Sequence, residues 1–592
     1  MPDLVVDDVT FRYPGAAAPA LSDVRLGIGQ GEVVLVAGPS GCGKSTLALA
    51  LCGLVPARVR GHLSGSVHLG GVALSSLQPH QVATQVGMVF QDPASQLITP
   101  TVEAEVAFGP ENLALARDDI SRRVEQALTA TGTDRMRRAS TASLSGGEKQ
   151  RVAIAATLAM RPDVLILDEP CSDLDPAGTQ AILAVLRRLN REHGMTIVLV
   201  EHRIDEVVPW VNRVVLLDHG RVVLDRPTRD AFDEPRRWNT LGVAVPEMVR
   251  LGHALPHVFA GELPLSVDDA YQALAGSPEA QNLAATTRHA PEHPPMHGGD
   301  PVISWDDVSM RYDDHPVLSG VNLAARPGDW LAVAGPNGSG KTSLVELAMG
   351  FRRPTGGTVT LHGHRVDASD VSRQAQQVGY LFQSADTMLF TASVAKELRF
   401  ALQHRRRTPH QGDRPPRSLF PRRRPRPDHQ KRVAQLLDLI GLSERPAADP
   451  FSLSAGQRER LAIAALLVEA PAALILDEPT TGQDEAHAHA ILTFLDDLRR
   501  DAELTYVMVT HDMRVVARYA TRLAVLAGGR ILADGPPAAV FAHREVLSEA
   551  NLVAPPVADL HSRLAPAGLP SVSLSVPELL TALGVPRLLI PA

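Results

Sequence analysis

Apolar residues along this chain fall into short, uninterrupted runs that end at polar or glycine-rich segments. The clearest runs are Val33 to Val36, Val86 to Phe90, Val164 to Leu167 and Thr196 to Val200. Continuous apolar runs of this length are typical of strands buried on both faces of a parallel sheet. Residues 1 to 37 otherwise alternate apolar and polar positions around a turn at Pro14 and Gly15, which predicts a small sheet that leads into the following loop.

The first apolar run leads into a glycine-rich loop and then into the helical segment Thr46 to Cys52. A strand, a loop of the form GxxxxGKS and a helix together indicate a phosphate-binding loop, in which backbone N–H groups surround the phosphates. Lys44 is expected to reach the β and γ phosphates, and the Ser45 hydroxyl to coordinate magnesium. The nucleotide-binding residues predicted here are Gly38, Pro39, Ser40, Gly41, Cys42, Gly43, Lys44, Ser45 and Thr46.

Two further segments suit phosphate and metal chemistry. Ser145 and two glycines stand immediately before the helix-forming run Lys149 to Met160. Unpaired N–H groups and the positive end of the helix dipole favour a phosphate there, and the glycines let it approach closely. Asp168 and Glu169 follow the third apolar run, and two carboxylates at the carboxyl end of a strand suit magnesium and a reacting water.

These segments together resemble a known family. LSGGE from Leu144, VLILDEP from Val164 and SDLD ending at Asp175 resemble the signature, Walker B and D-loop motifs of ABC-type ATPases, in that family's order. The resemblance implies an α/β fold with two tandem P-loop ATPase domains. Each domain would contain a parallel core sheet with helices, an antiparallel β subdomain, a helical signature subdomain and a small C-terminal extension.

The resemblance also implies roles for single residues of the first half. Gln91 occupies the Q-loop position, whose glutamine touches magnesium and reports on the membrane partner in this family. His202 follows the last apolar run at the H-loop position, where a histidine contacts the γ phosphate. Tyr13 stands where the family places an aromatic ring that stacks on adenine, although an ordinary hairpin tyrosine would fit this position too.

The second half of the chain repeats these motifs in the same order. Lys341 follows Lys44 by 297 positions, whereas Asp477 follows Asp168 by 309, so twelve extra residues lie between the two motifs. An Arg- and Pro-rich stretch at 404–431 accounts for them, as a solvated loop or as a contact with anionic lipid. The remaining predicted nucleotide-binding residues are Ser145, Gly146, Gly147, Tyr312, Gly335, Pro336, Asn337, Gly338, Ser339, Gly340, Lys341, Thr342, Ser343, Gln383, Ser454, Ala455 and Gly456.

Repeats and composition predict the domain boundaries. The first ATPase domain spans 1–228 and its C-terminal extension 229–276, followed by a linker at 277–300 that is rich in Pro, His, Gly and Ala. The second domain spans 301–536, including the 404–431 insertion, and its extension spans 537–592. The two extensions resemble each other, because VPEM at Val245 reappears as VPEL at Val576.

In this family a signature motif cannot reach the Walker A loop of its own domain, so the resemblance implies head-to-tail pairing of the halves around two ATP molecules. Site one would combine Lys44 with the signature around Ser454, and site two would combine Lys341 with that around Ser145. The implied cofactors are ATP and Mg²⁺. The implied catalytic residues are Glu169, His202, Glu478 and His511, and the implied magnesium ligands are Ser45, Gln91, Asp168, Thr342, Gln383 and Asp477.

Length and composition limit the number of domains, the kinds of binding partner and the location that we expect for the chain. The 592 residues are too many for one core and suit two halves, and a net charge of -8 argues against broad nucleic-acid binding. The acidic start and the lack of an apolar run of about 18 residues predict neither a signal peptide nor a membrane span, and hence a cytoplasmic location. Cys42, Cys52 and Cys171 have no metal-ligand spacing; packing as small residues is favoured over a role in which oxidation blocks ATP.

The segment from Gln91 to Asn112 most resembles the ATPase subunits of energy-coupling-factor (ECF) importers. The resemblance implies a peripheral protein on the cytoplasmic face of the membrane. Its partners would be a transmembrane coupling (T) protein and a substrate-capture (S) membrane protein, contacted through Gln91 to Asn112 and through Gln383 to Phe400. The family imports vitamins, their precursors, or cobalt and nickel ions, and fused forms suggest thiamine or its pyrimidine precursor.

Two alternatives stay open. A soluble twin ATPase acting on ribosomes or DNA would usually carry a long charged helical linker or cysteine zinc modules, and neither occurs here. A fused ATPase of sugar importers usually has one degraded half, whereas Lys44, Lys341, Glu169 and Glu478 are all present.

The two signatures differ at one position, which predicts unequal ATP sites. Gly146 of the first half corresponds to Ala455 of the second, which would face the ATP held by Lys44. A methyl group near the phosphate, or a backbone that needs positive φ, would slow site one, unless the position tolerates alanine freely.

Overall fold

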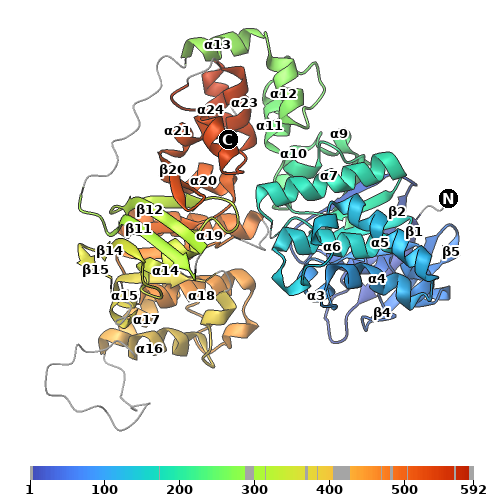
Figure 1. The fold of residues 1–592 in the computed structure, drawn as a ribbon, viewed down its shortest axis with the longest axis horizontal. Helices are drawn as coiled ribbons and strands as arrows, with labels where there is room; N and C mark the ends of the chain where they lie inside the picture. The colour runs from blue at the N-terminus through green and yellow to red at the C-terminus, as the bar shows by residue number, and fades with distance from the viewer. Residues whose placement is uncertain are drawn as a thin grey trace.

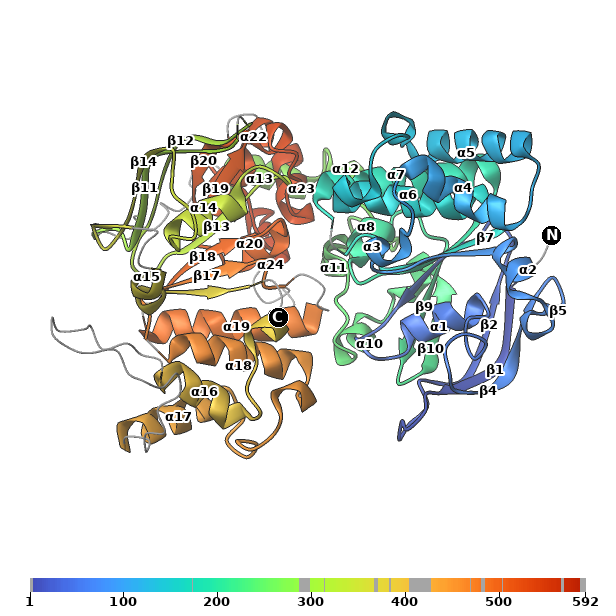
Figure 2. The ribbon, with the colours of Figure 1, turned by 60° about the horizontal axis from the view of Figure 1, so that its bottom comes forward.

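The computed structural model describes residues 4–172, 174–286, 299–313, 315–366, 371–382, 385–403, 427–468, 470–480, 485–502, 504–565 and 569–585. Figure 1 shows two halves of similar architecture, the first in blue to green and the second in yellow to red. Figure 2 shows the same halves side by side from another direction. Two tandem α/β domains are therefore confirmed.

A six-stranded sheet forms the centre of the first half. Its strand order is β10-β9-β3-β8-β7-β6; the five strands from β9 to β6 are parallel and β10 is antiparallel. The strands are β3 (Val33–Ala37), β6 (Val86–Val89), β7 (Val164–Asp168), β8 (Thr196–Val200), β9 (Arg213–Asp218) and β10 (Arg221–Pro227). The four apolar runs of the sequence thus form β3, β6, β7 and β8, buried as predicted.

The second half has an equivalent six-stranded sheet, in the order β16-β17-β18-β13-β19-β20. Its strands are β13 (Trp330–Ala334), β16 (Val378–Leu381), β17 (Ala473–Asp477), β18 (Thr505–Val509), β19 (Arg522–Ala527) and β20 (Arg530–Gly535). In both sheets the strand before the glycine-rich loop lies next to the strand that ends in the H-loop histidine. The three strands that carry chemistry are therefore neighbours.

Each half also has a four-stranded antiparallel sheet, as the alternating pattern of residues 1 to 37 predicts for the first. The first contains β1 (Leu4–Arg12), β2 (Leu21–Ile28), β4 (His62–Leu69) and β5 (Val72–Ala73). The second contains β11 (Ile303–Tyr312), β12 (His315–Ala325), β14 (Gly356–Leu361) and β15 (His364–Arg365). One apolar core joins β1 and β2 to the outer face of the parallel sheet, with Phe11, Leu21 and Val34 fully buried in it.

Helices surround the sheets and form a signature subdomain in each half. In the first half these are α1 (Lys44–Leu51), α2 (Pro79–Ala83), α3 (Pro93–Gln96), α4 (Val102–Asn112), α5 (Arg117–Thr131), α6 (Gly146–Ala159), α7 (Pro176–His193) and α8 (Ile204–Val207). In the second they are α14 (Lys341–Ala348), α15 (Val371–Gln377), α16 (Val394–Gln403), α17 (Pro427–Leu439), α18 (Ala455–Leu467), α19 (Glu485–Ala502) and α20 (Met513–Tyr519). Apolar faces of α4, α5 and α6 pack together around Val106, Leu128 and Val152. None of the helices in the described part of the chain has the length and hydropathy needed to span a bilayer.

The C-terminal extensions of the two halves share one core. The first contributes α9 (Thr228–Ala231), α10 (Pro235–Thr240), α11 (Glu247–Ala254), α12 (Val267–Leu274) and α13 (Pro278–Thr286). The second contributes α21 (Pro537–Ala542), α22 (Arg544–Glu549), α23 (Pro556–Leu564) and α24 (Val576–Ala582). Met248 and Leu251 of α11 lie in the same apolar cluster as Leu560 of α23 and Leu579 of α24. Figure 1 shows α11 and α12 in green beside α23 and α24 in red.

The first part of the predicted linker is a helix, which the sequence analysis did not predict. Helix α13 occupies its first third and packs on α24, with Leu283 fully buried, so the described chain is helical there. Residues 287–298 and most of the Arg- and Pro-rich insertion, 404–426, lie outside the described residues. The last residues of the insertion belong to α17.

The shared core generates a stability prediction. Replacing the fully buried Leu579 by alanine should lower the unfolding temperature, because a leucine cavity typically costs about 2–5 kcal/mol. Differential scanning calorimetry measures this change. Val553, which is half exposed, provides the control, since Val553→Ala should leave the transition within about a degree of the parent. Equal shifts in the two variants would contradict a shared core between the extensions.

Candidate active site

Both glycine-rich loops have the same geometry. Gly43 caps α1 with a left-handed backbone (φ 109°), and a Cβ added there would lie 2.4 Å from the Ala20 carbonyl oxygen, so glycine is required. Lys44 Nζ donates to the carbonyls of Gly38 (2.8 Å) and Pro39 (3.0 Å). In the second half Lys341 Nζ donates in the same way to Gly335 (2.8 Å) and Pro336 (2.9 Å). The two ammonium groups thus lie at the centre of the loops.

The Walker B aspartates meet the loops at the strand ends. A side-chain hydrogen bond links Asp168 to Ser45, and burial raises the pKa of Asp168 despite that bond. Its Oδ1 is buried without a hydrogen-bond partner in the described part of the chain. A buried carboxylate oxygen beside a hydroxyl suits a magnesium ion, which would satisfy both groups. The residues present therefore fit the predicted metal.

Glu169 gathers the other predicted groups of the first half. Its Oε1 lies 2.8 Å from His202 Nε2, and its Oε2 accepts from Gln91 Nε2 at 3.0 Å. Glu169 has φ 49°, in the left-handed region that non-glycine residues rarely adopt. Its N–H donates to Val200 O (2.9 Å), which anchors the strained turn to β8. The structure therefore brings together the predicted Q-loop, Walker B and H-loop residues.

The second half repeats this turn with different partners. Glu478 has φ 50°, and its Oε1 lies 3.1 Å from His511 Nδ1. Tyr380 donates its hydroxyl to Asp477 Oδ2 (2.7 Å), whereas Met88 occupies the equivalent place in the first half. Burial raises the pKa of Asp477, and the Tyr380 bond opposes this shift. Gln383 lies outside the described residues.

The signatures begin the helices α6 and α18. Glu148 Oε2 accepts from the N–H (2.8 Å) and the hydroxyl (2.9 Å) of Ser145, and Gln457 Oε1 accepts from Ser454 N–H (3.1 Å). Gly146 is the first residue of α6 and does not have positive φ. The prediction that backbone strain at Ala455 slows site one is therefore wrong. The bulk of the added methyl group is the reason that still supports an effect.

One contact joins a D-loop to the opposite phosphate loop. Asp175 caps α7 through Gly178 N–H (2.8 Å to Oδ1), and its Oδ2 accepts from the backbone N–H of Asn337 at 3.3 Å. Asn337 belongs to the Walker A loop of the second half, so the first half reaches into site two. This contact agrees with head-to-tail pairing. Asp484, the matching D-loop residue, lies outside the described residues.

The two tyrosines lie beside the phosphate loops. The Tyr13 hydroxyl is 3.1 Å from Thr46 Oγ1, and the Tyr312 hydroxyl is 3.3 Å from Ser343 Oγ. The guanidinium of Arg352 lies over the Tyr312 ring, 4.7 Å from its centroid. Their positions at the start of α1 and α14 are compatible with an adenine contact.

The three cysteines are buried and unpaired. Burial raises the pKa of Cys52 to about 12 and raises the pKa of Cys42 and Cys171 as well. The thiolate form that reacts with oxidants is therefore disfavoured, which supports packing over redox sensitivity. In the described part of the chain, these cysteines belong to no cluster of three or more His, Cys, Asp or Glu side chains that could hold a metal, which is a different kind of site from that of Asp168 and the Ser45 hydroxyl.

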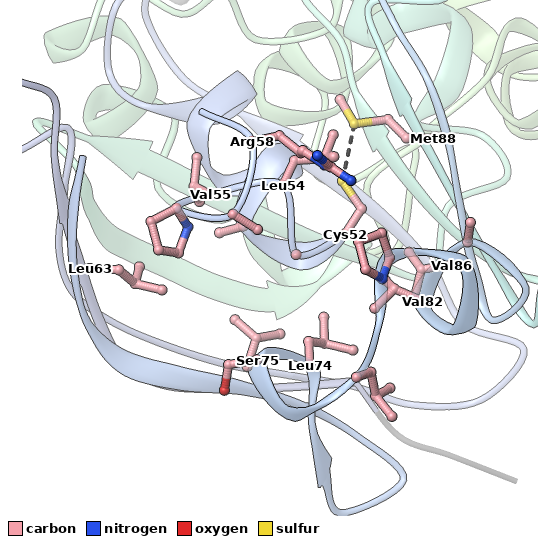
Figure 3. Close-up of a pocket in the computed structure, with 18 of the residues that line it drawn as sticks. Cys52, Leu54, Val55, Arg58, Leu63, Leu74, Ser75, Val82, Val86 and Met88 are labelled. Carbon is pink, nitrogen blue, oxygen red and sulfur yellow. Dashed lines mark hydrogen bonds between the residues drawn. The ribbon is translucent and has the colours of Figure 1, made fainter. Parts of the chain in front are cut away.

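Sequence reasoning missed an apolar pocket next to the first Q-loop. A cavity of about 460 Å³ opens between α1, α2 and the strands β4 and β6, with Leu54, Val55, Leu63 and Val82 among its lining residues. Figure 3 shows these side chains pointing toward one another around the cavity. Met88 and Phe90, which lie three positions and one position before Gln91, also line the cavity.

Comparison with known proteins identifies the family. The ABC transporter family matches residues 21–172 and 318–481, which together are more than half of the chain. A Methanosarcina mazei protein, assigned as an ABC transporter ATP-binding protein, is 39% identical over 97% of this chain and 95% of its own length. The chain belongs to the ABC transporter family.

Other relatives cover one or both halves of this ABC ATPase. YkoD of Bacillus subtilis, assigned as an HMP/thiamine import ATP-binding protein, is 30% identical over 93% of this chain and 95% of its own length. The solved structure of CbiO1 from Clostridium perfringens, described as part of the ABC transporter complex CbiONQ, is 35% identical. It covers 40% of this chain and 94% of its own, with a TM-score of 0.36. The chain is thus an ATP-binding, ATP-hydrolysing protein with two ABC domains.

The ABC ATPase site generates a catalytic prediction. Glu169→Gln combined with Glu478→Gln should nearly abolish ATP hydrolysis while nucleotide binding persists, since glutamine keeps the shape but cannot take a proton. Phosphate release and a fluorescent-nucleotide titration measure the two properties. Undiminished hydrolysis in the double variant would refute the assignment of both glutamates.

Glu201 generates a pH prediction. It is 2% exposed and accepts from Cys171 N–H (3.1 Å), and burial raises its pKa to about 7, with Glu206 and Glu169 adding to the shift. The unfolded chain ionises near 4.5, so the native state holds an extra proton between these values. Ionisation of Glu201 should therefore contribute a fall of about 3 kcal/mol in the free energy of unfolding as pH rises from 4.5 to 7.

The unfolding temperature measured across this pH range tests the linkage. Glu201→Gln should flatten the decline, because glutamine does not ionise. The exposed Glu262 is the control, and Glu262→Gln should keep the slope of the parent. A parent and a Glu201→Gln protein with the same slope would contradict the raised pKa.

Proposed function

We propose that this chain is the ATP-hydrolysing subunit of an ECF-type importer for a vitamin, a vitamin precursor or a transition-metal ion. It acts with a transmembrane coupling protein and a substrate-capture membrane protein, on the cytoplasmic face of the membrane. ATP and Mg²⁺ occupy two sites between the halves, and closure of the halves moves the coupling protein. The 30% identity to a relative assigned to HMP/thiamine import supports an importer.

The observation that carries this proposal is a matched pair of exposed apolar patches. Ile98 and Phe390 occupy equivalent positions after the two Q-loops and are 64% and 62% exposed. Phe90 and Phe382, directly before the two Q-loop glutamines, are also exposed. Large apolar side chains exposed at two equivalent places are typical of a protein interface. The apolar pocket of Figure 3 adjoins Phe90 and extends the first patch.

The first apolar patch lies next to a residue that contacts the candidate catalytic glutamate, which connects the patch to the ATP site. Gln91 donates to Glu169 at 3.0 Å and immediately follows Phe90. A partner held against the patch would therefore move with the Q-loop when the catalytic glutamate changes its contacts. The same connection in reverse lets ATP binding act on the partner.

Two other uses of a twin ATPase are less well supported. An action on ribosomes or DNA offers no reason for apolar residues at both Q-loops, because nucleic-acid surfaces favour basic ones. A sugar-importer ATPase with one degraded half disagrees with the intact hydrogen bonds of both Walker A lysines.

Co-purification from detergent-solubilised membranes of the source cells tests the proposal. The parent chain should bring down two small integral membrane proteins, which mass spectrometry identifies. Ile98→Asp combined with Phe390→Asp should lose them, since a carboxylate disrupts an apolar contact, while ATP hydrolysis by the purified chain continues.

Val553→Asp is the matched control, because Val553 is a similarly exposed apolar residue away from the Q-loops. It should retain the membrane proteins. Capture of ribosomes or of a single large permease instead, or equal capture by the double variant, would overturn the ECF assignment.

A further inference from the structure

The two catalytic histidines use different ring nitrogens. His202 contacts Glu169 through Nε2 (2.8 Å), whereas His511 contacts Glu478 through Nδ1 (3.1 Å). The Nε2 of His511 faces the other half of the molecule, where it lies 3.2 Å from Nη2 of Arg203. His511 is also the more buried of the two, with 5% of its side chain exposed.

The contact with Arg203 fixes the protons on the His511 ring. A guanidinium has only donors, so Nε2 of His511 must accept and carries no proton. A neutral imidazole then has its proton on Nδ1, where it is donated to Glu478 Oε1. One arginine of the first half thus sets both hydrogen bonds of the histidine in the second half.

The described residues show no equivalent contact at the first site. His202 and His511 are 309 positions apart, and the residue 309 positions after Arg203 is Asp512. A carboxylate cannot donate to an imidazole nitrogen, and Asp512 caps α20 instead, accepting from Arg514 N–H (2.9 Å). The repeated sequence therefore places the arginine on one side only.

Hydrogen bonds that join the two halves lie near Arg203, around the same cavity. Arg514 donates to Asp205 Oδ2 (2.9 Å), Asp205 Oδ1 accepts from Glu247 N–H (3.0 Å), and Glu247 Oε2 accepts from Val557 N–H (3.2 Å). The first and third of these bonds cross between the halves, and the second lies within the first half. Arg203, Asp205, Glu247 and Arg514 line one cavity of about 460 Å³. Movement of one half against the other would have to break the two crossing bonds.

We propose that Arg203 is a positioning residue for the second ATP site, acting in trans from the first half. It holds His511 as the Nδ1–H tautomer bound to Glu478, and so couples the catalytic glutamate of site two to the relative position of the halves. The inference rests on the assignment of His511 and Glu478 to site two and does not depend on the membrane partner. It makes the two ATP sites unequal for a reason separate from the signature motifs.

Nitrogen-15 NMR of the full chain, labelled at histidine, tests the contact directly. Imidazole shifts distinguish the Nδ1–H from the Nε2–H tautomer, and His511→Gln identifies the resonances of His511. The parent should show the Nδ1–H tautomer at His511, and Arg203→Ala should lose this preference while the His202 resonances stay in place. An unchanged His511 spectrum in Arg203→Ala would overturn the proposal.

Two further variants separate positioning from a general effect on folding. Arg203→Lys keeps a single cationic donor and should restore most of the parent spectrum. Arg518→Ala removes another arginine that lines the same cavity but bonds His489, and it should leave His511 unchanged. Equal spectral changes in Arg518→Ala and Arg203→Ala would show a nonspecific effect and refute the proposal.

Turnover in single-site backgrounds provides the functional test. With Glu169→Gln, only site two can turn over, and adding Arg203→Ala should lower kcat by roughly tenfold, the size expected for a lost charged hydrogen bond. With Glu478→Gln, only site one can turn over, and Arg203→Ala should have little effect. Equal losses in the two backgrounds would refute a role confined to site two, whereas a changed spectrum with unchanged turnover would refute the role assigned to His511.

Discussion

The order of strands in each six-stranded sheet decides where the reactive side chains lie. All parallel strands end at the same edge, and β3, β8 and β7 are consecutive in the first sheet. The loop with Lys44, the histidine His202 and the carboxylates Asp168 and Glu169 therefore emerge side by side, although they lie up to 158 positions apart in the sequence. Hydrogen bonds of the sheet, rather than contacts among the polar groups, place this chemistry.

The backbone is strained where it leaves that edge of the sheet. Glu169 and Glu478 both adopt positive φ, a conformation worth of order 1–3 kcal/mol of strain, directly after a fully parallel strand. Bonds from their N–H groups to Val200 and Val509 hold the turns against the neighbouring strand. The strained turn directs each carboxylate to its histidine without a flexible loop.

Local chemistry is predictable from the sequence. The resemblance to ABC-type ATPases implies head-to-tail pairing of the halves, but the individual contacts between the halves are not predictable. The Walker A loops and the Walker B carboxylates follow from short motifs placed at the ends of strands, whereas the roles of the two histidines follow from the resemblance to ABC-type ATPases. Helix α6 begins three residues before the helix-forming run Lys149 to Met160, at a capping box of Ser145 and Glu148 that the sequence contains. Helix α13 was hidden in a linker composition because its packing depends on α24, which lies about 300 positions later.

Contacts across the halves depend on placement in space, and they show why one chain suits this arrangement. The pair Asp205 and Arg514 occupies equivalent positions in the two repeats, so the pseudo-two-fold relation brings each position against its counterpart. Two first halves from separate chains would place Asp205 against Asp205, and two second halves would place Arg514 against Arg514. Like charges at a partly buried contact disfavour both pairings, whereas the observed pair attracts. Fusion in one chain holds a first half and a second half together at high effective concentration. The opposite charges of Asp205 and Arg514 make this pairing the preferred one.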